Sequence, residues 1–236
     1  MCSSDLQEDG HLKLADELGL AIIGVERQGK LSSPKYVVEE IKDVTPVFVE
    51  KVYRRKKDIP CVIAETPRFT IRETSDCDLD VLMRMGQEPD MHPWMRPTNS
   101  YDVEKEMLYA YRHNMYDLFE YGMWLIADKE NGAIIGEIGF SNQLMDGVMY
   151  PDLGYAVEEA YRRMGTALEC GQAVLEYMRD TIGCKVVTCH IQEENVPSLS
   201  LAEKLGFSVC KKEEKDGKTV IVLKKELAPA LASLQF

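Results

Sequence analysis

The segment from Arg162 to Ala167, RRMGTA, joins two arginines to small residues just before an amphipathic stretch. This order predicts a strand, a short turn and a helix that begins near Gly165. The first N–H groups of a helix have no partner inside it, and the helix dipole is positive at that end. Such an end can bind a phosphate, especially where glycine lets the ligand approach the backbone. The candidate residues are Arg162, Arg163, Met164, Gly165, Thr166 and Ala167. An ordinary helix start with solvated arginines is the alternative.

The elements that must position this segment follow from the pattern of apolar residues. From residue 68 the pattern predicts a strand, two helices, three strands, a helix, a strand, a helix and a hairpin. This order is typical of an α+β fold with a mixed sheet. The pattern before residue 68 predicts a strand at 21–26, helices at 35–44 and 45–58, and a short strand and a break within 59–67. These elements predict a small α/β unit. We therefore expect a unit at 1–66, a domain at 67–227 and a tail at 228–236.

The composition limits the kinds of partner. The chain has 236 residues, with 40 acidic and 28 basic side chains and a formal net charge of -12. Such acidity argues against nucleic-acid binding, which depends on neutralising phosphates, and favours a cationic partner or substrate. The alternative is an acidic surface that only keeps the protein dissolved.

The distribution of apolar residues and cysteines predicts the cellular setting. No apolar run approaches the roughly 18 residues of a membrane span, and the first residues do not resemble a signal peptide. The seven cysteines show no C-x-x-C spacing, which favours core positions over a disulfide framework or a metal site. We expect a cytoplasmic protein that binds neither a membrane nor a metal ion.

Three sequence blocks occur in a fixed order around the RRMGTA segment. DLGYAV precedes it, Arg162, Gly165 and Ala167 fill the pattern R-x-x-G-x-A, and NVPSLSLAEKLGF begins thirty residues after Gly165. Together the blocks resemble the GNAT N-acetyltransferase superfamily, in particular its branch of ribosomal-protein N-terminal acetyltransferases. The resemblance covers about residues 67 to 227, with one departure, because Glu159 stands where the family usually has proline.

The resemblance implies a GNAT-type sheet, mixed and mostly antiparallel, flanked by helices and preceded here by the small α/β unit. In that fold the fourth and fifth strands diverge, and the pantetheine arm of acetyl-CoA pairs with the exposed strand edge. The phosphates then lie at the segment 162–167. The other cofactor-binding residues that the resemblance implies are Tyr155, Ala156, Val157, Asn195, Ser198 and Lys204. Acetyl-CoA is the co-substrate, and no metal is needed.

The resemblance also implies candidates for proton transfer. Attack of an amine on a thioester requires the neutral amine, so a base or a water relay is useful. His190 stands where relatives have a glutamate base, and Asp152 and Glu137 are rival candidates. Relatives place a tyrosine acid where this chain has Ala202. Ser198 is the remaining candidate to hydrogen-bond the CoA sulfur, unless it only caps its helix.

The implied activity is transfer of the acetyl group of acetyl-CoA to a primary amine, by direct attack in a ternary complex. The acceptor is a small cationic amine or a basic peptide or protein N-terminus, which His92, Trp94 and Tyr101 would frame. A non-catalytic acyl-CoA-binding sensor is the alternative, and the missing tyrosine supports it. For residues 1–66, docking, regulation and oligomerisation stay open, with a homodimer as one such assembly.

Overall fold

The chain folds as two compact units, Met1–Cys61 and Val62–Phe236. The computed structural model describes residues 3–25, 35–87 and 99–228, with side chains from Gly10 onward. Most of the tail expected at 228–236 therefore lies outside the described residues.

The N-terminal unit contains two short parallel strands and two helices. They are α1 (Ser3–Glu17), β1 (Ile23–Val25), β2 (Tyr36–Val38) and α2 (Pro46–Lys56). Helix α2 begins where the Thr45 side chain accepts a hydrogen bond from the N–H of Phe48. Pro46 fits the first turn because that position needs no N–H donor. At the other end of α2, Lys56 forms an ion pair of 2.6 Å with Asp16 of α1.

The segment 35–44 differs from the helix that we expected there. It forms β2 and then a single 3-10 turn at Ile41–Asp43. Val37 and Val38 are β-branched and favour an extended backbone. They pair with Gly24 and Val25 of β1, so tertiary pairing outweighs the helical spacing of the apolar residues.

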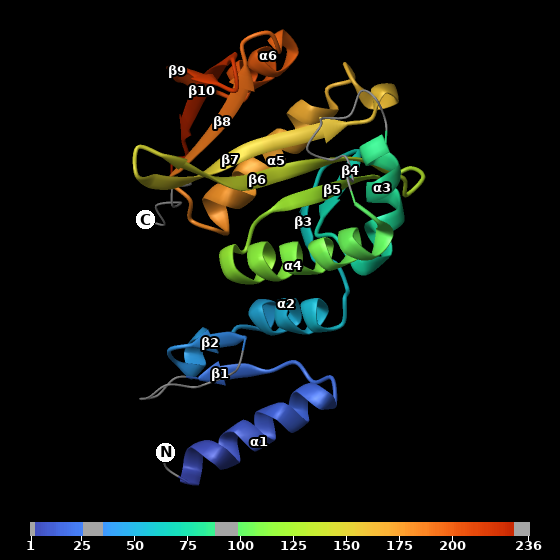
Figure 1. The fold of residues 1–236 in the computed structure, drawn as a ribbon, viewed down its shortest axis with the longest axis vertical. Coiled ribbons are helices and arrows are strands. Elements are labelled where there is room, and N and C mark those ends of the chain that lie inside the picture. The colour runs from blue at the N-terminus through green and yellow to red at the C-terminus, as the bar shows by residue number, and fades with distance from the viewer. Residues whose placement is uncertain (1–2, 26–34, 88–98, 229–236) are drawn as a thin grey trace, which may run out of the picture. The chain divides into compact units, whose positions relative to one another are not determined.

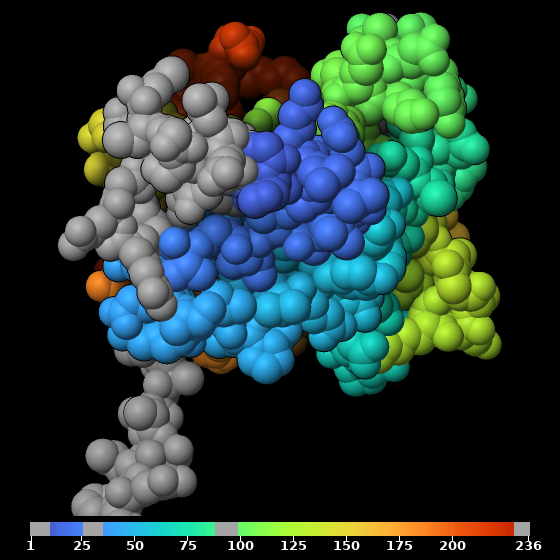
Figure 2. Space-filling model, turned by 90° about the horizontal axis from the view of Figure 1, so that it is seen from below, coloured from blue at the N-terminus to red at the C-terminus, as the bar shows by residue number. Residues whose placement is uncertain are grey.

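The N-terminal unit is drawn in blue tones in Figure 2. Several of its large apolar side chains are exposed. Leu18 is 65% and Val47 is 72% exposed. Among the described residues of this unit, the buried hydrophobic side chains are Tyr36, Val52 and Cys61. The unit therefore has a small hydrophobic core.

The second unit is an eight-stranded sheet with the order β3-β4-β5-β6-β7-β8-β10-β9 (Figure 1). Its strands are β3 (Val62–Glu65), β4 (Phe69–Arg72), β5 (Met123–Asp128), β6 (Ile134–Met145), β7 (Val148–Val157), β8 (Val186–Gln192), β9 (Ser208–Lys215) and β10 (Lys218–Glu226). Neighbouring strands are antiparallel except β7 and β8, which are parallel. This mixed, mostly antiparallel sheet confirms the α+β fold expected from the sequence.

Helices cover both faces of this sheet. They are α3 (Leu79–Gln87), α4 (Tyr101–Phe119), α5 (Thr166–Asp180) and α6 (Val196–Lys204). Helix α5 buries Val174 and Met178 in the main core, together with Trp124 of β5. Met85 of α3 packs against Ala156 of β7 in a separate cluster. Because side chains alternate along a strand, Ala156 and α3 lie on the face opposite to α5.

The large sheet begins earlier than residue 67, where the sequence placed the boundary. Strand β3 pairs with β4 in an antiparallel register, with Glu65 opposite Thr70. Without β3, one edge of β4 would present unpaired backbone N–H and C=O groups. The strand expected to close the N-terminal unit therefore belongs to the sheet of the second unit.

Within the described ranges, no helix is both long and apolar enough to cross a membrane. The same residues contain no group of three His, Cys, Asp or Glu side chains that could hold a metal ion.

Candidate active site between two diverging strands

The parallel strands β7 and β8 separate soon after they meet. One bridge, Asp152 opposite Thr188, joins them, whereas β6 and β7 pair from Gly136 to Met145. Among the described strands, the edge of β7 from Leu153 to Val157 has no pairing partner on the side of β8. Its backbone N–H and C=O groups can therefore bind a ligand that carries its own amides.

Helix α5 follows the open end of β7 after a tight turn. Gly165 stands just before the helix with a φ of +78°, and Arg163 also has a positive φ, of 59°. A Cβ on Gly165 would lie 3.7 Å from Nη2 of Arg68, which is paired with Glu169 of α5 at 2.7 Å. Arg68 thus adds a cation beside the helix start. The sequence reasoning missed it because it lies almost a hundred residues away.

Among the expected phosphate-binding residues, two form hydrogen bonds within the turn and two have exposed side chains. Nε of Arg162 donates a hydrogen bond of 2.8 Å to the carbonyl oxygen of Val157. The hydroxyl of Thr166 donates to the carbonyl oxygen of Tyr161 at 2.9 Å. The side chains of Arg163 and Met164 are exposed. Arg162 and Thr166 therefore hold the shape of the turn itself.

Asp152 and His190, expected as rival bases, form one hydrogen-bonded pair. Nδ1 of His190 lies 2.6 Å from Oδ1 of Asp152, and the Thr188 hydroxyl donates to the same oxygen at 2.7 Å. The hydrogen bond with Asp152 raises the pKa of His190 above its ordinary value, although burial opposes it. When Nδ1 of the neutral ring donates to the carboxylate, Nε2 is left to accept a proton. Thr188 is a further site residue that the sequence reasoning missed.

A second polar pair spans the gap between β7 and α6. The hydroxyl of Tyr155 lies 2.8 Å from the hydroxyl of Ser198. Burial raises the pKa of Tyr155, and the hydrogen bond with Ser198 opposes this effect. Asn195 caps α6 by accepting a hydrogen bond from the N–H of Ser198 at 3.2 Å. The alternative that Ser198 itself caps the helix is therefore wrong, since its hydroxyl faces Tyr155.

The remaining predicted site residues lie apart from these two pairs. Glu137 is half-buried on β6, opposite Ala156. Tyr101 begins α4 and is exposed, and the nearby carboxylate of Asp80 raises its pKa. Lys204 is exposed at the last residue of α6. The expected acceptor-binding residues His92 and Trp94 lie outside the described residues.

Ala202 is 4% exposed and belongs to the main core. The position at which relatives carry a tyrosine therefore faces the core of this chain. The phenol that hydrogen-bonds Ser198 is Tyr155, which comes from β7 and not from α6.

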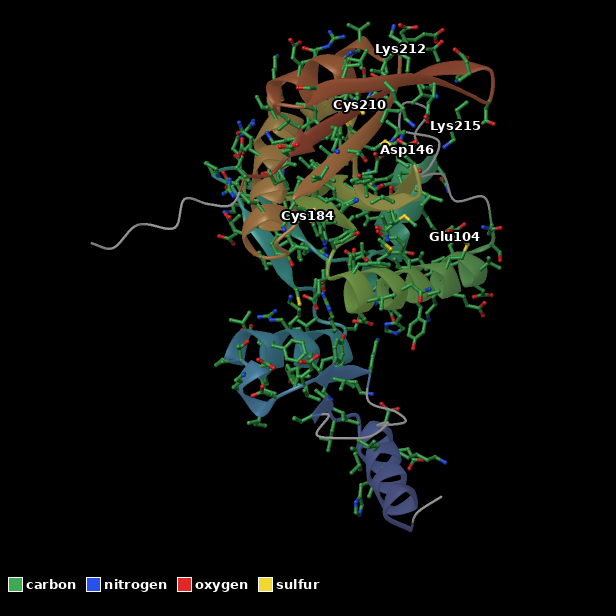
Figure 3. All side chains as sticks on the ribbon, turned by 90° about the vertical axis from the view of Figure 1, so that its left-hand side faces the viewer. Glu104, Asp146, Cys184, Cys210, Lys212 and Lys215 are labelled. Carbon is green, nitrogen blue, oxygen red and sulfur yellow. The ribbon has the colours of Figure 1, made fainter. Side chains whose placement is uncertain are left out.

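An ion pair joins the turn of the β6–β7 hairpin to β9. Asp146 lies in the turn of the β6–β7 hairpin, and its Oδ1 is 3.5 Å from Nζ of Lys211 on β9. Figure 3 shows Asp146 below the hairpin that carries Lys212 and Lys215. Lys211 also pairs with Glu213 at 3.3 Å. The charge of Glu213 raises the pKa of His190 further, after the stronger effect of Asp152. Charges of both signs therefore act on the pKa of His190.

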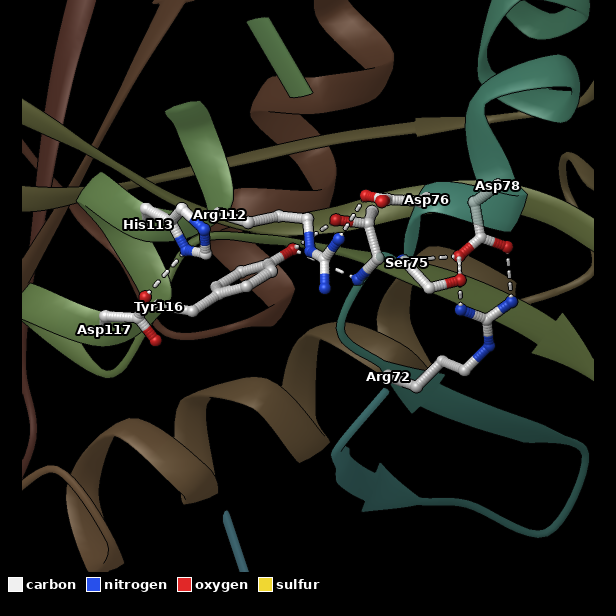
Figure 4. Close-up of polar contacts among 9 residues, drawn as sticks. Arg72, Ser75, Asp76, Asp78, Arg112, His113, Tyr116 and Asp117 are labelled. Carbon is white, nitrogen blue, oxygen red and sulfur yellow. Dashed lines mark hydrogen bonds and ion pairs between the residues drawn. The ribbon is translucent and has the colours of Figure 1, made fainter. Parts of the chain in front are cut away.

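A polar network anchors the turn between β4 and α3 (Figure 4). Arg72 donates two hydrogen bonds to Asp78, at 2.7 and 2.8 Å, and Ser75 donates to the same carboxylate. Burial alone would raise the pKa of Asp78, but the bonds from Arg72 and Ser75 lower it below its ordinary value. The Tyr116 hydroxyl of α4 bonds the carbonyl oxygen of Met123 in β5. These contacts hold α3 and α4 against the face of the sheet that carries Asp152.

Comparison with known proteins finds acetyltransferases at the level of both the family model and individual relatives. A family model described as an acetyltransferase (GNAT) domain matches residues 68–208, more than half of the chain. The uncharacterized N-acetyltransferase YjdG of Bacillus subtilis is 29% identical over 84 residues, which are 36% of this chain and 49% of that protein. The uncharacterized N-acetyltransferase p20 of Bacillus licheniformis is 26% identical over 143 residues, covering 60% of this chain and 80% of that protein.

A solved structure supports the same grouping. A putative GNAT-family acetyltransferase from Bordetella pertussis is 27% identical, with a TM-score of 0.59, and the match covers 68% of this chain and 97% of that one. The diverging strands, the glycine before α5 and the family match all lie in the second unit. The chain belongs to the GNAT acetyltransferase family.

Proposed function

We propose that this chain transfers the acetyl group of acetyl-CoA to a primary amine, by direct attack within a ternary complex. One observation carries the proposal. The Asp152–His190 pair stands at the point where β7 and β8 separate, so an acid-base group lies beside an open strand edge. This is the arrangement that a thioester and an attacking amine require.

The residues of the site fit acetyl-CoA in two respects. The unpaired edge from Leu153 to Val157 offers N–H and C=O groups to the amides of a pantetheine arm. At the start of α5, Gly165 has no Cβ, so a diphosphate can approach the first N–H groups of the helix. When bound, acetyl-CoA supplies a thioester carbon for attack and a thiol as the leaving group.

The side chains of the site account for the proton transfers. Nε2 of His190 takes the proton of the amine as the new C–N bond forms. Asp152 orients the ring and stabilises the imidazolium that results. The Tyr155–Ser198 hydroxyl pair donates a hydrogen bond to the sulfur as the C–S bond breaks. The C–S electron pair leaves with the sulfur as a thiolate, which then takes up through water the proton held by His190. The products are an amide and the free thiol of CoA, and His190 is neutral again.

The acceptor class follows from charge. A net charge of -12 favours a cationic acceptor, which is a small amine or a basic peptide or protein N-terminus. A non-catalytic acyl-CoA sensor is the competing function. The buried Ala202 at the tyrosine position favours it, because the usual proton donor is absent.

Release of the CoA thiol in the presence of a panel of amines and peptides tests the proposal. We expect turnover with at least one cationic acceptor. His190→Ala lowers kcat by about 10²- to 10⁴-fold, the usual contribution of a general base, without loss of CoA binding. His113→Ala is the matched control, because His113 forms a similar pair with Asp117 at 2.9 Å on α4. Tight CoA binding without thiol release for any acceptor would favour the sensor.

A further inference from the structure

Arg68 reaches the start of α5 from the turn between β3 and β4. A Cβ on Gly165 would lie 3.7 Å from Nη2 of Arg68, and outside the chain neighbours of Gly165 no other described atom lies within 4 Å of that position. The space over Gly165 is therefore open, and a guanidinium borders it. An open space beside the first N–H groups of a helix and next to a cation suits a phosphate.

Glu169, in the first turn of α5, holds one edge of this guanidinium. Nε of Arg68 donates to Oε2 of Glu169 at 2.8 Å, and Nη2 lies 2.7 Å from the same oxygen. Burial alone would raise the pKa of Glu169, but hydrogen bonds from Thr66 and Arg68 lower it below its ordinary value and keep the carboxylate charged. Nη1 forms no hydrogen bond with any residue that the structure describes. The outer end of the guanidinium, Nη1 and one hydrogen of Nη2, can therefore donate to a ligand.

The backbone that carries the guanidinium is fixed as well. The N–H of Arg68 donates to Oε1 of Glu169 at 3.1 Å, and its carbonyl oxygen accepts from the N–H of Lys129 at 2.9 Å. The Thr66 hydroxyl closes the turn by accepting from the N–H of Phe69 at 2.9 Å. The Phe69 ring centre lies 4.8 Å from the guanidinium. Because the side chain is already held, binding a ligand costs little further conformational entropy.

The arginines within the turn before α5 are placed differently. Nε of Arg162 donates to the carbonyl oxygen of Val157, and Arg163 is exposed. Glu169 itself places a carboxylate at the helix start, which would repel a phosphate if no cation neutralised it. Arg68 can therefore assist phosphate binding in two ways, by direct contact or by neutralising Glu169.

We infer that Arg68 binds the diphosphate of acetyl-CoA directly, through Nη1 and Nη2, while Glu169 holds the guanidinium in place. The inference rests on the proposed function and adds to the cofactor site a residue outside the segment 162–167. Glu169 is then a positioning residue, because it acts through Arg68. The contact makes the turn between β3 and β4 part of the selection of CoA over a donor without phosphates.

Calorimetry of CoA binding to the full-length protein measures this contact without requiring turnover. We expect Arg68→Gln to weaken CoA binding by about 10- to 100-fold, the range expected for hydrogen bonds between charged groups. Dephospho-CoA, which keeps the diphosphate but lacks the 3′-phosphate, should show the same loss. Pantetheine, which has no phosphate, should bind the wild type and Arg68→Gln equally. Arg179→Gln is the matched control, because Arg179 forms a similar pair with Asp180 at the other end of α5 and should leave CoA binding unchanged.

A double variant separates contact from neutralisation. If Arg68 binds the diphosphate, Arg68→Gln should weaken CoA binding by about the same factor when Glu169 is already replaced by Gln. No loss in that background would overturn the inference, because Arg68 would then only neutralise Glu169. Arg68→Lys keeps the charge but not the planar fork, so it answers the question even if Arg68→Gln does not fold. It should bind CoA more weakly than the wild type, and undiminished binding would overturn the contact through Nη1 and Nη2.

The inference and the proposed function fail separately. Equal CoA affinity of the wild type and Arg68→Gln would overturn the inference while leaving acetyl transfer intact. A loss for CoA that is absent for dephospho-CoA would also overturn it, because that result assigns Arg68 to the 3′-phosphate. CoA binding without thiol release for any acceptor would refute the proposed acetyl transfer, and the calorimetry would still decide whether Arg68 binds the diphosphate.

Discussion

Replacing Asp152 by asparagine isolates the effect of one charge on the proposed base. In the wild type, Oδ1 of Asp152 lies 2.6 Å from Nδ1 of His190, and the side chains are 6% and 15% exposed. The hydrogen bond with this carboxylate raises the pKa of His190. Asp152→Asn keeps the size of the side chain and the neighbouring Thr188 hydroxyl, but removes the charge. We therefore expect the pKa of His190 to fall.

The size of the shift follows from the hydrogen bond that is lost. A hydrogen bond to a charged group contributes about 1.5 to 3 kcal/mol, and one pKa unit corresponds to about 1.4 kcal/mol. The pKa of His190 should therefore fall by about one to two units. A base acts in its neutral form, so activity rises as pH increases through this pKa. In the pH–rate profile of Asp152→Asn, the rise on the acid side should therefore move to lower pH. The plateau rate should fall, because the amide introduced at position 152 can also hydrogen-bond the His190 tautomer that carries its proton on Nε2.

The assay is thiol release against pH, from about pH 5 to about pH 9, with kcat/KM reporting the free enzyme. Thr188→Val serves as the control, since it removes a donor to Asp152 without removing charge. Its acid limb should move much less than that of Asp152→Asn. An unchanged or higher-pH acid limb in Asp152→Asn would refute the assignment of His190 as the base.

Three further predictions concern the rest of the second unit. Gly165→Ala should weaken CoA binding, because a side chain at a φ of +78° costs about 1 to 2 kcal/mol and lies where phosphate approaches. Tyr155→Phe and Ser198→Ala should each lower kcat by about tenfold, and the double variant should lose little more, because the two hydroxyls act as a pair. Asp78→Asn should lower the free energy of unfolding by about 2 to 3 kcal/mol near pH 7, measured by urea denaturation. Since the folded pKa of Asp78 is lowered, this loss should shrink as pH falls below about 4.

Each of these predictions has its own control or contrary result. Gly132→Ala places the same strain at a φ of +74° in an open turn and should leave CoA binding unchanged. Equal weakening by both glycine variants would mean that strain alone is responsible. Additive losses for Tyr155 and Ser198 would show that the hydroxyls act independently. A destabilisation by Asp78→Asn that persists at low pH would point to packing instead of charge.

Much of the fold was predictable from local patterns. A local pattern within about fifteen residues predicts the strand at 69–72, the helix after Gly165 and the β9–β10 hairpin. The helix expected at 35–44 was wrong because pairing with β1 decides its conformation. The strand at 62–65 was assigned to the wrong unit for the same reason, since nothing within it shows that β4 is its partner.

The sequence by itself determined the order of the blocks, the glycine before α5 and the acidic charge, because these depend on neighbours in the chain or on composition alone. Only the tertiary structure decided that Asp152 and His190, 38 residues apart, form one pair, and that Tyr155 meets Ser198, 43 residues away. The parallel contact between β7 and β8 brings these residues together, and the divergence of the strands opens the edge beside them. Long-range pairing of this kind has no local signature, because its favourable contacts form only after the intervening chain has closed.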